Sequence, residues 1–145
     1  MDRGLAVLLT AAVGGLIAMQ PAVNSGLGRE TGSLAAALVS FTVGTIVLAA
    51  IVVVAGQAGG LRATLDAGPV YLIGGLLGAA YVTMAIFAVR EIGAGGVAAA
   101  TITGQLTFSV LLDRFGVLGL EQTPITPSRV AGIALLLTGT WLIIR

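Results

Sequence analysis

The chain has 145 residues, of which 57% are hydrophobic and 9% are charged, and its formal net charge is +1. Soluble domains carry about 25% charged residues, so this chain has too few polar side chains to cover a surface in water. A net charge of +1 gives no basic stripe, so we do not expect nucleic acid as a partner. The sequence contains no cysteine and no histidine, the usual carriers of metal and triad chemistry. We therefore expect neither an enzyme nor a protein that holds a cofactor or a metal.

Charged residues divide the sequence into five apolar stretches, most of them near the ~20 residues that cross a bilayer as a helix. These stretches are too long for barrel strands and do not alternate between apolar and polar residues. The sequence predicts an all-α integral membrane protein with one transmembrane domain, 1–145. Its five predicted transmembrane helices cover residues 4–28, 33–55, 69–89, 97–112 and 127–144.

Turn and cap residues mark several of these boundaries. Proline is favoured at the first position of a helix, which suits Pro69 and Pro127. Thr126 is the predicted N-cap of the last span. The glycine-rich run 93–96 predicts a tight turn between the third and fourth spans.

The arginines are spread almost evenly over the two sides of the predicted bundle. An excess of Lys and Arg normally keeps one side in the cytoplasm, and here four arginines face three, with no lysine present. The balance favours dual topology, in which two copies pair as an antiparallel homodimer of ten helices. The alternative is a single orientation set by something other than charge. The two groups are Arg3, Arg62, Arg114 and Arg129 on one side, and Arg29, Arg90 and Arg145 on the other.

A polar patch interrupts the first span. Gln20 and Asn24 are four residues apart and share a helical face. Pro21 lacks a backbone N–H and is expected to break the helix beside these amides. Such a discontinuous helix would present polar groups to a solute near the bilayer midplane. The alternative is a kinked helix whose amides bond to neighbouring helices.

A second polar stripe runs along the fourth span. Thr101 and Gln105 lie one turn apart, and Ser109 and Asp113 continue the series. Serine and threonine often bond to their own helix backbone, whereas a central glutamine has more hydrogen-bonding positions to fill. The predicted substrate-binding residues are Gln20, Asn24 and Gln105, with Ser40 and Thr101 as second choices.

Small residues predict helix packing on the third span. Gly74, Gly75 and Gly78 include a small-xxx-small pattern, which allows close approach of helices in lipid. We interpret these glycines as packing positions rather than as a site.

The charged residues lie at span ends or in predicted loops. Arg90 with Glu91, and Asp113 with Arg114, are expected as pairs at the membrane interface. Proton-coupled exchange of cations usually uses a carboxylate buried in the membrane, and no span has one at its centre.

Residues 20–28 have the pattern Q-x-x-x-N-x-x-L-G, and a series of short motifs follows along nearly the whole chain. Those motifs are Ser40–Thr45, Gly74–Ala79, Gly104–Leu106, Asp113–Gly116 and Arg129–Gly132. Each motif is weak alone, but the ordered set resembles the YdcZ-like family of the drug/metabolite transporter superfamily.

This resemblance implies a short five-helix protein of the bacterial inner membrane that acts as half of a transporter and exports a small molecule. Its expected partners are a second copy, membrane lipid and an unknown small solute. The chain lacks the first-span glutamate of small multidrug exporters, so their proton/cation exchange is not implied. Two other readings stay open, an ion channel of dual topology and a membrane scaffold or subunit without transport.

Overall fold

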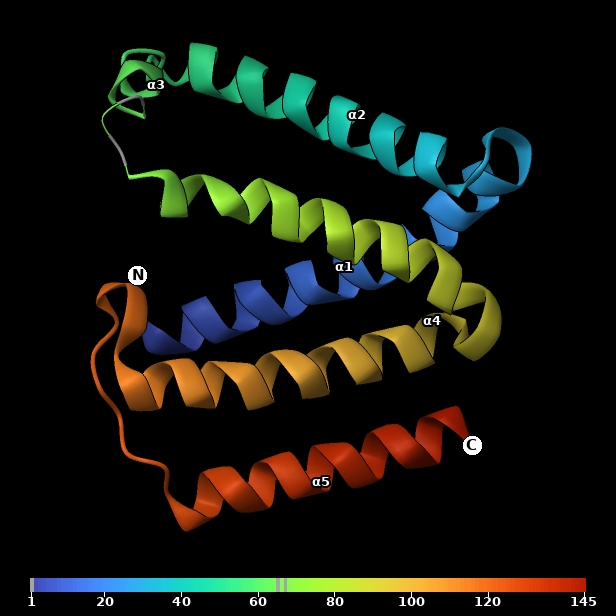
Figure 1. Cartoon of the computed structure of the whole chain (residues 1–145), viewed down its shortest axis with the longest axis vertical. Helices are drawn as coiled ribbons and strands as arrows, with labels where there is room; N and C mark the ends of the chain where they lie inside the picture. Colours follow the sequence, from blue (N-terminus) through green and yellow to red (C-terminus); the bar gives the residue numbers. More distant parts are fainter. Residues whose placement is uncertain (1, 65, 67) are drawn as a thin grey trace. The chain divides into compact units, whose positions relative to one another are not determined.

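The computed structural model describes residues 2–64, 66 and 68–145, and every regular element in that part of the chain is helical (Figure 1). The four helices long and apolar enough to cross a membrane there are α1, α2, the segment Pro69–Phe115 and α5. The elements are α1 (Arg3–Thr31), α2 (Ser33–Val54), α3 (Gly60–Ala63), η1 (Pro69–Leu72), α4 (Ile73–Phe115), η2 (Val117–Gly119) and α5 (Pro127–Ile144).

The segment Pro69–Phe115 contains two membrane-length helices rather than one. Its 47 residues would extend ~70 Å as a single helix, more than twice the ~30 Å thickness of the hydrocarbon core. Gly93 interrupts the helical backbone with φ 69° and ψ 171°, a conformation that is essentially limited to glycine. The predicted turn over 93–96 is therefore confined to Gly93, because the three residues after it are helical.

The start of α5 confirms the predicted boundary. The Thr126 hydroxyl accepts a hydrogen bond from the backbone N–H of Arg129, and Pro127 occupies the first turn. Pro69 likewise begins η1, which leads into α4. By contrast, α1 and α2 are joined by Gly32 alone, whose φ of 88° again favours glycine.

The chain forms two compact units, which we call the 19–90 unit (Met19–Arg90) and the 91–145 unit (Glu91–Arg145 together with the chain up to Ala18). In the 19–90 unit, α2 and the first half of α4 share an apolar core. Its buried members are Ala36, Ala37, Val82 and Ile86, with Phe41 and Tyr81 packed against them.

The three predicted packing glycines differ in their surroundings. A β-carbon on Gly78 would lie 3.2 Å from Cζ of Phe41, so the absence of a side chain lets α4 approach α2 there. Within the described chain, nothing lies within 4 Å of the corresponding positions on Gly74 and Gly75. Gly78 is thus at a helix contact inside one chain, and the other two glycines are not.

In the 91–145 unit, the second half of α4 packs against α5. Val97 and Val110 are buried, and Gly95 and Gly96 bring the backbone of α4 close to Ile143 and Ile144 at the end of α5. Most large apolar side chains of both units remain exposed. A protein in water would bury them, whereas lipid can cover them in a membrane.

Candidate functional site

A hollow of about 190 Å³ lies against the middle of α2 in the 19–90 unit. Five of its lining residues follow the spacing of one helical face of α2, and Gln20 reaches it from α1. We call it the α2 hollow, and its lining residues are Gln20, Ser40, Phe41, Gly44, Thr45 and Leu48. It therefore combines an amide and two hydroxyls with an aromatic ring and a leucine.

The two amides predicted for the site take different positions. The amide nitrogen of Asn24 donates to the hydroxyl of Ser40 at 3.2 Å, and Asn24 is only 6% exposed. Asn24 thus holds α1 against α2 at the edge of the α2 hollow, while Gln20, one turn earlier, lines it. The structure brings together three of the five predicted residues, Gln20, Asn24 and Ser40.

Gln105 and Thr101 belong to the 91–145 unit. The side chain of Gln105 is exposed and that of Thr101 is half-buried, and neither has a side-chain hydrogen bond to another described residue. The structure therefore does not join them to Gln20 and Ser40.

Pro21 lies inside α1, where the sequence predicted an interruption. The helix runs continuously from Arg3 to Thr31, and Pro21 is buried. Proline removes one backbone hydrogen bond, but a membrane helix tolerates that loss where neighbouring groups satisfy the freed carbonyl. The polar side chains at 20 and 24 are consequently presented by a continuous helix.

Ser25 forms a polar contact that the sequence analysis missed. It is 4% exposed and accepts a hydrogen bond of 3.1 Å from Nε of Arg90, at the end of the first half of α4. Gly28 leaves room for the guanidinium, since a β-carbon there would lie 3.1 Å from Nη2 of Arg90. Arg90 therefore contacts Ser25 rather than the predicted Glu91, a pairing that no spacing within one span could have indicated.

The buried polar groups of the 91–145 unit connect two helices. Thr103, which is 6% exposed, lies 2.6 Å from Thr140 across the contact between α4 and α5. Each hydroxyl also lies within hydrogen-bond distance of a backbone carbonyl on the facing helix, Thr140 of Ala99 at 3.1 Å and Thr103 of Leu136 at 3.4 Å. Thr103 lies beside the predicted polar stripe of Thr101 and Gln105, not on it. Its hydrogen bonds to α5 favour a structural role.

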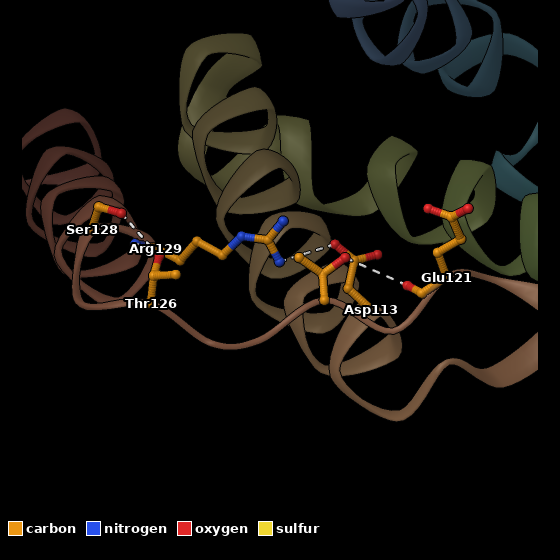
Figure 2. Close-up of polar contacts among 6 residues, drawn as sticks. Asp113, Glu121, Thr126, Ser128 and Arg129 are labelled. Atoms are coloured by element: carbon orange, nitrogen blue, oxygen red, sulfur yellow. Dashed lines mark hydrogen bonds and ion pairs between the residues drawn. The ribbon is translucent and has the colours of Figure 1, made fainter.

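Asp113 pairs with Arg129 rather than with the predicted Arg114. Nη1 of Arg129 lies 3.2 Å from Oδ2 of Asp113, and both side chains are about one-third exposed (Figure 2). The backbone N–H of Thr123 also donates to the carbonyl of Asp113 at 2.9 Å. These contacts tie the end of α4 to the loop and to the first turn of α5.

Comparison with known families agrees with the motif series. Residues 5–142 match the family model described as "Putative inner membrane exporter, YdcZ", a match that covers both compact units and the α2 hollow. The chain belongs to the YdcZ family. No curated protein and no solved structure gives a significant match.

YdcZ membership and the apolar helices together place the chain in the inner membrane as a multi-pass protein. The family is described as one of inner membrane exporters, which are transporters rather than enzymes. Among the residues that the structure describes, no cluster of acidic side chains is arranged to hold a metal ion.

Proposed function

We propose that this YdcZ protein exports small uncharged solutes as an antiparallel homodimer, with the α2 hollow of each copy contributing to the solute site. The observation that carries the proposal is an amide, two hydroxyls and an aromatic ring gathered around a hollow beside α2, a helix apolar and long enough to cross a membrane. Polar groups within a membrane are expensive unless they bond to each other or serve a pathway. Asn24 has a partner in Ser40, whereas Gln20 has none among the described residues and faces the hollow.

The depth of the hollow supports a site near the bilayer midplane. Gly44, at the centre of its α2 face, lies eleven residues after Ser33 and ten before Val54. At 1.5 Å per residue these separations are ~16 Å and ~15 Å, about half of the hydrocarbon thickness on each side. A solute at this depth is equally far from both surfaces, as alternating access requires.

The chemistry of the lining supports an uncharged solute. The side chains that line the α2 hollow carry no ionisable group, and the sequence 33–54 of α2 contains no charged residue. A charged solute would lose its hydration there without gaining a counter-charge. A neutral solute with an apolar body can donate to and accept from Gln20 while its body contacts Phe41 and Leu48.

The size of the hollow supports a pair of chains. Ligand sites usually enclose about 300 Å³ or more, and the α2 hollow of about 190 Å³ is smaller. Two copies related by an axis in the membrane plane would join two hollows into one site, and the balanced arginines allow that pairing. Gln105 and Thr101 remain candidates for further lining in such a dimer, and lipid would cover the outward faces. Rocking of the glycine-packed helices would then open the site to each side in turn.

Three probes of one shape test the charge preference. Benzamide is neutral, benzamidine is a cation and benzoate is an anion, so they differ mainly in charge. We expect saturable binding of benzamide to the purified dimer, measured by saturation-transfer NMR, and at least about tenfold weaker binding of the two ions. The Gln20→Glu variant should gain affinity for benzamidine, whereas the same change outside the hollow, Gln57→Glu, should not.

Transport is then measured as uptake of labelled benzamide into inverted vesicles, because an exporter moves its solute into the lumen of such vesicles. Saturable flux that Gln20→Leu abolishes supports the carrier. Equal binding of all three probes to wild type and to Gln20→Leu contradicts the site, and flux that never saturates favours the channel reading instead.

A further inference from the structure

Phe41 lies between the α2 hollow and the backbone of α4. Its ring lines the α2 hollow, and it also packs on the backbone of α4 at Gly78. A β-carbon on Gly78 would lie 3.2 Å from Cζ and 3.5 Å from Cε1 of that ring. The ring therefore rests in a space that exists because residue 78 has no side chain.

The other neighbours of this contact are closely packed. Phe41 borders the core formed by Ala36, Ala37, Val82 and Ile86, of which Ala36 and Ile86 are fully buried. A side chain that is pushed away from Gly78 meets this packed core on one side and the unfilled hollow on the other. Since close-packed interiors yield little, the ring would move toward the hollow.

We propose that Gly78 is a positioning residue that sets the size of solute that the α2 hollow accepts, by holding the Phe41 ring back against α4. The inference rests on the proposed function, because it assigns a size limit to that same site. Gly78 itself does not line the hollow, and it acts through Phe41. A methyl group at position 78 is expected to shift the ring by a few tenths of an ångström and so to narrow the hollow.

Nearby glycines provide matched controls. Gly75 lies on the same helix, and a β-carbon there would meet nothing within 4 Å in the described chain. Gly75→Ala therefore adds the same methyl group without touching Phe41. Gly44 lines the hollow and is equally open, so Gly44→Ala fills it directly and shows what a narrowed hollow does.

The first test does not depend on any solute. Thr45 lines the hollow, and the chain has no cysteine, so Thr45→Cys places one thiol there. The measurement is the ratio of its alkylation rates by bulky N-benzylmaleimide and by compact N-methylmaleimide. We expect Gly44→Ala, which adds a methyl group inside the hollow, to lower this ratio by about tenfold, the discrimination typical of one carbon in an apolar pocket. Gly78→Ala should lower it by a smaller factor, and Gly75→Ala should leave it unchanged.

If the Phe41 ring transmits the effect of the methyl group, the double variant Gly78→Ala/Phe41→Leu should restore the ratio of alkylation rates. A restored ratio also shows that the protein folds with a methyl group at position 78. An unchanged ratio in Gly78→Ala, or a lowered ratio that Phe41→Leu does not restore, overturns the inference.

The second test separates the inference from the proposed function. Binding of benzamide and of 4-propylbenzamide is compared in the same variants. Selective loss of the larger probe in Gly78→Ala supports both proposals. If the alkylation ratio shifts but the protein binds neither probe, Gly78 still determines the size of the α2 hollow. The same result rejects the α2 hollow as a site for such solutes and so rejects the proposed function.

Discussion

Arg90 donates a hydrogen bond from Nε to the buried hydroxyl of Ser25, 3.1 Å away, and so ties the first half of α4 to the last turns of α1. The guanidinium lies over Gly28, near the C-terminal end of α1, where the helix dipole favours a positive charge. This contact joins two helices of the 19–90 unit, and Arg90 has no acidic partner among the described residues.

Ser25→Ala removes the acceptor of this bond. A hydrogen bond to a charged group contributes roughly 1.5–3 kcal/mol, and Arg90 is exposed enough to regain water, so we expect a loss of about 1 kcal/mol. The measurement is SDS-induced unfolding of the purified protein. Ser109→Ala, on an exposed position of α4, is the control and should change the unfolding free energy by less than about 0.5 kcal/mol. Equal effects of the two changes would contradict the assigned contact.

The bond between Asn24 and Ser40 is best measured by a double-mutant cycle. Hydrogen bonds between membrane helices average about 0.6 kcal/mol, so we expect a coupling of that size between Asn24→Ala and Ser40→Ala. Thr42 bonds to the Leu38 carbonyl of its own helix, and a cycle of Asn24→Ala with Thr42→Ala should give no coupling. Comparable couplings in the two cycles would argue against the contact.

Gly93 supports the break between the two halves of α4. An alanine there must adopt φ near 69° and is expected to cost about 1–3 kcal/mol in the free energy of unfolding. Gly104 is helical and open, so Gly104→Ala should be neutral or stabilise by up to about 1 kcal/mol. If Gly93→Ala is as harmless as Gly104→Ala, the backbone at this position is not constrained as described.

The Asp113–Arg129 pair should be weak and sensitive to salt. Its side chains are 35% and 33% exposed, and exposed pairs contribute about 1 kcal/mol or less. We expect the coupling between Asp113→Asn and Arg129→Gln to fall as ionic strength rises from about 0.05 M to about 0.5 M. Glu121 with Arg129 serves as the reference cycle, because no ion pair joins them. A coupling that is large and independent of salt would contradict the exposed geometry.

Dual topology predicts that each loop is found on both sides of the membrane. Single cysteines at Glu30 and Glu121, on opposite faces of the predicted bundle, can be placed in the cysteine-free chain. A membrane-impermeant maleimide added to intact cells should label about half of each variant, since the arginines barely favour one orientation. Complete labelling of one variant and none of the other would show that all copies have one orientation. That result would contradict the proposed antiparallel homodimer.

Membrane location, helix boundaries and family could all be predicted from the sequence, because each depends on local features. Apolar length and charge spacing determine where a span starts and ends, and α5 lies over the predicted residues, 127–144. Thr126 and Pro127 act within a single turn and were predicted correctly. The ordered motifs are likewise a property of the chain alone, and the family match over residues 5–142 confirms the family that they indicate.

The partner of each polar side chain was decided only by the tertiary structure. Ser25 contacts Arg90, 65 positions away in the sequence, and Thr103 contacts Thr140, 37 positions away. Asp113 pairs with Arg129 and not with the adjacent Arg114. Helical periodicity shows which residues share a face, but not which other helix covers that face. The same limit explains why the sequence grouped Gly78 with Gly74 and Gly75, although Gly78 is the one that faces Phe41. Spans are determined by the affinity of each segment for lipid, whereas contacts depend on how segments distant in sequence pack together.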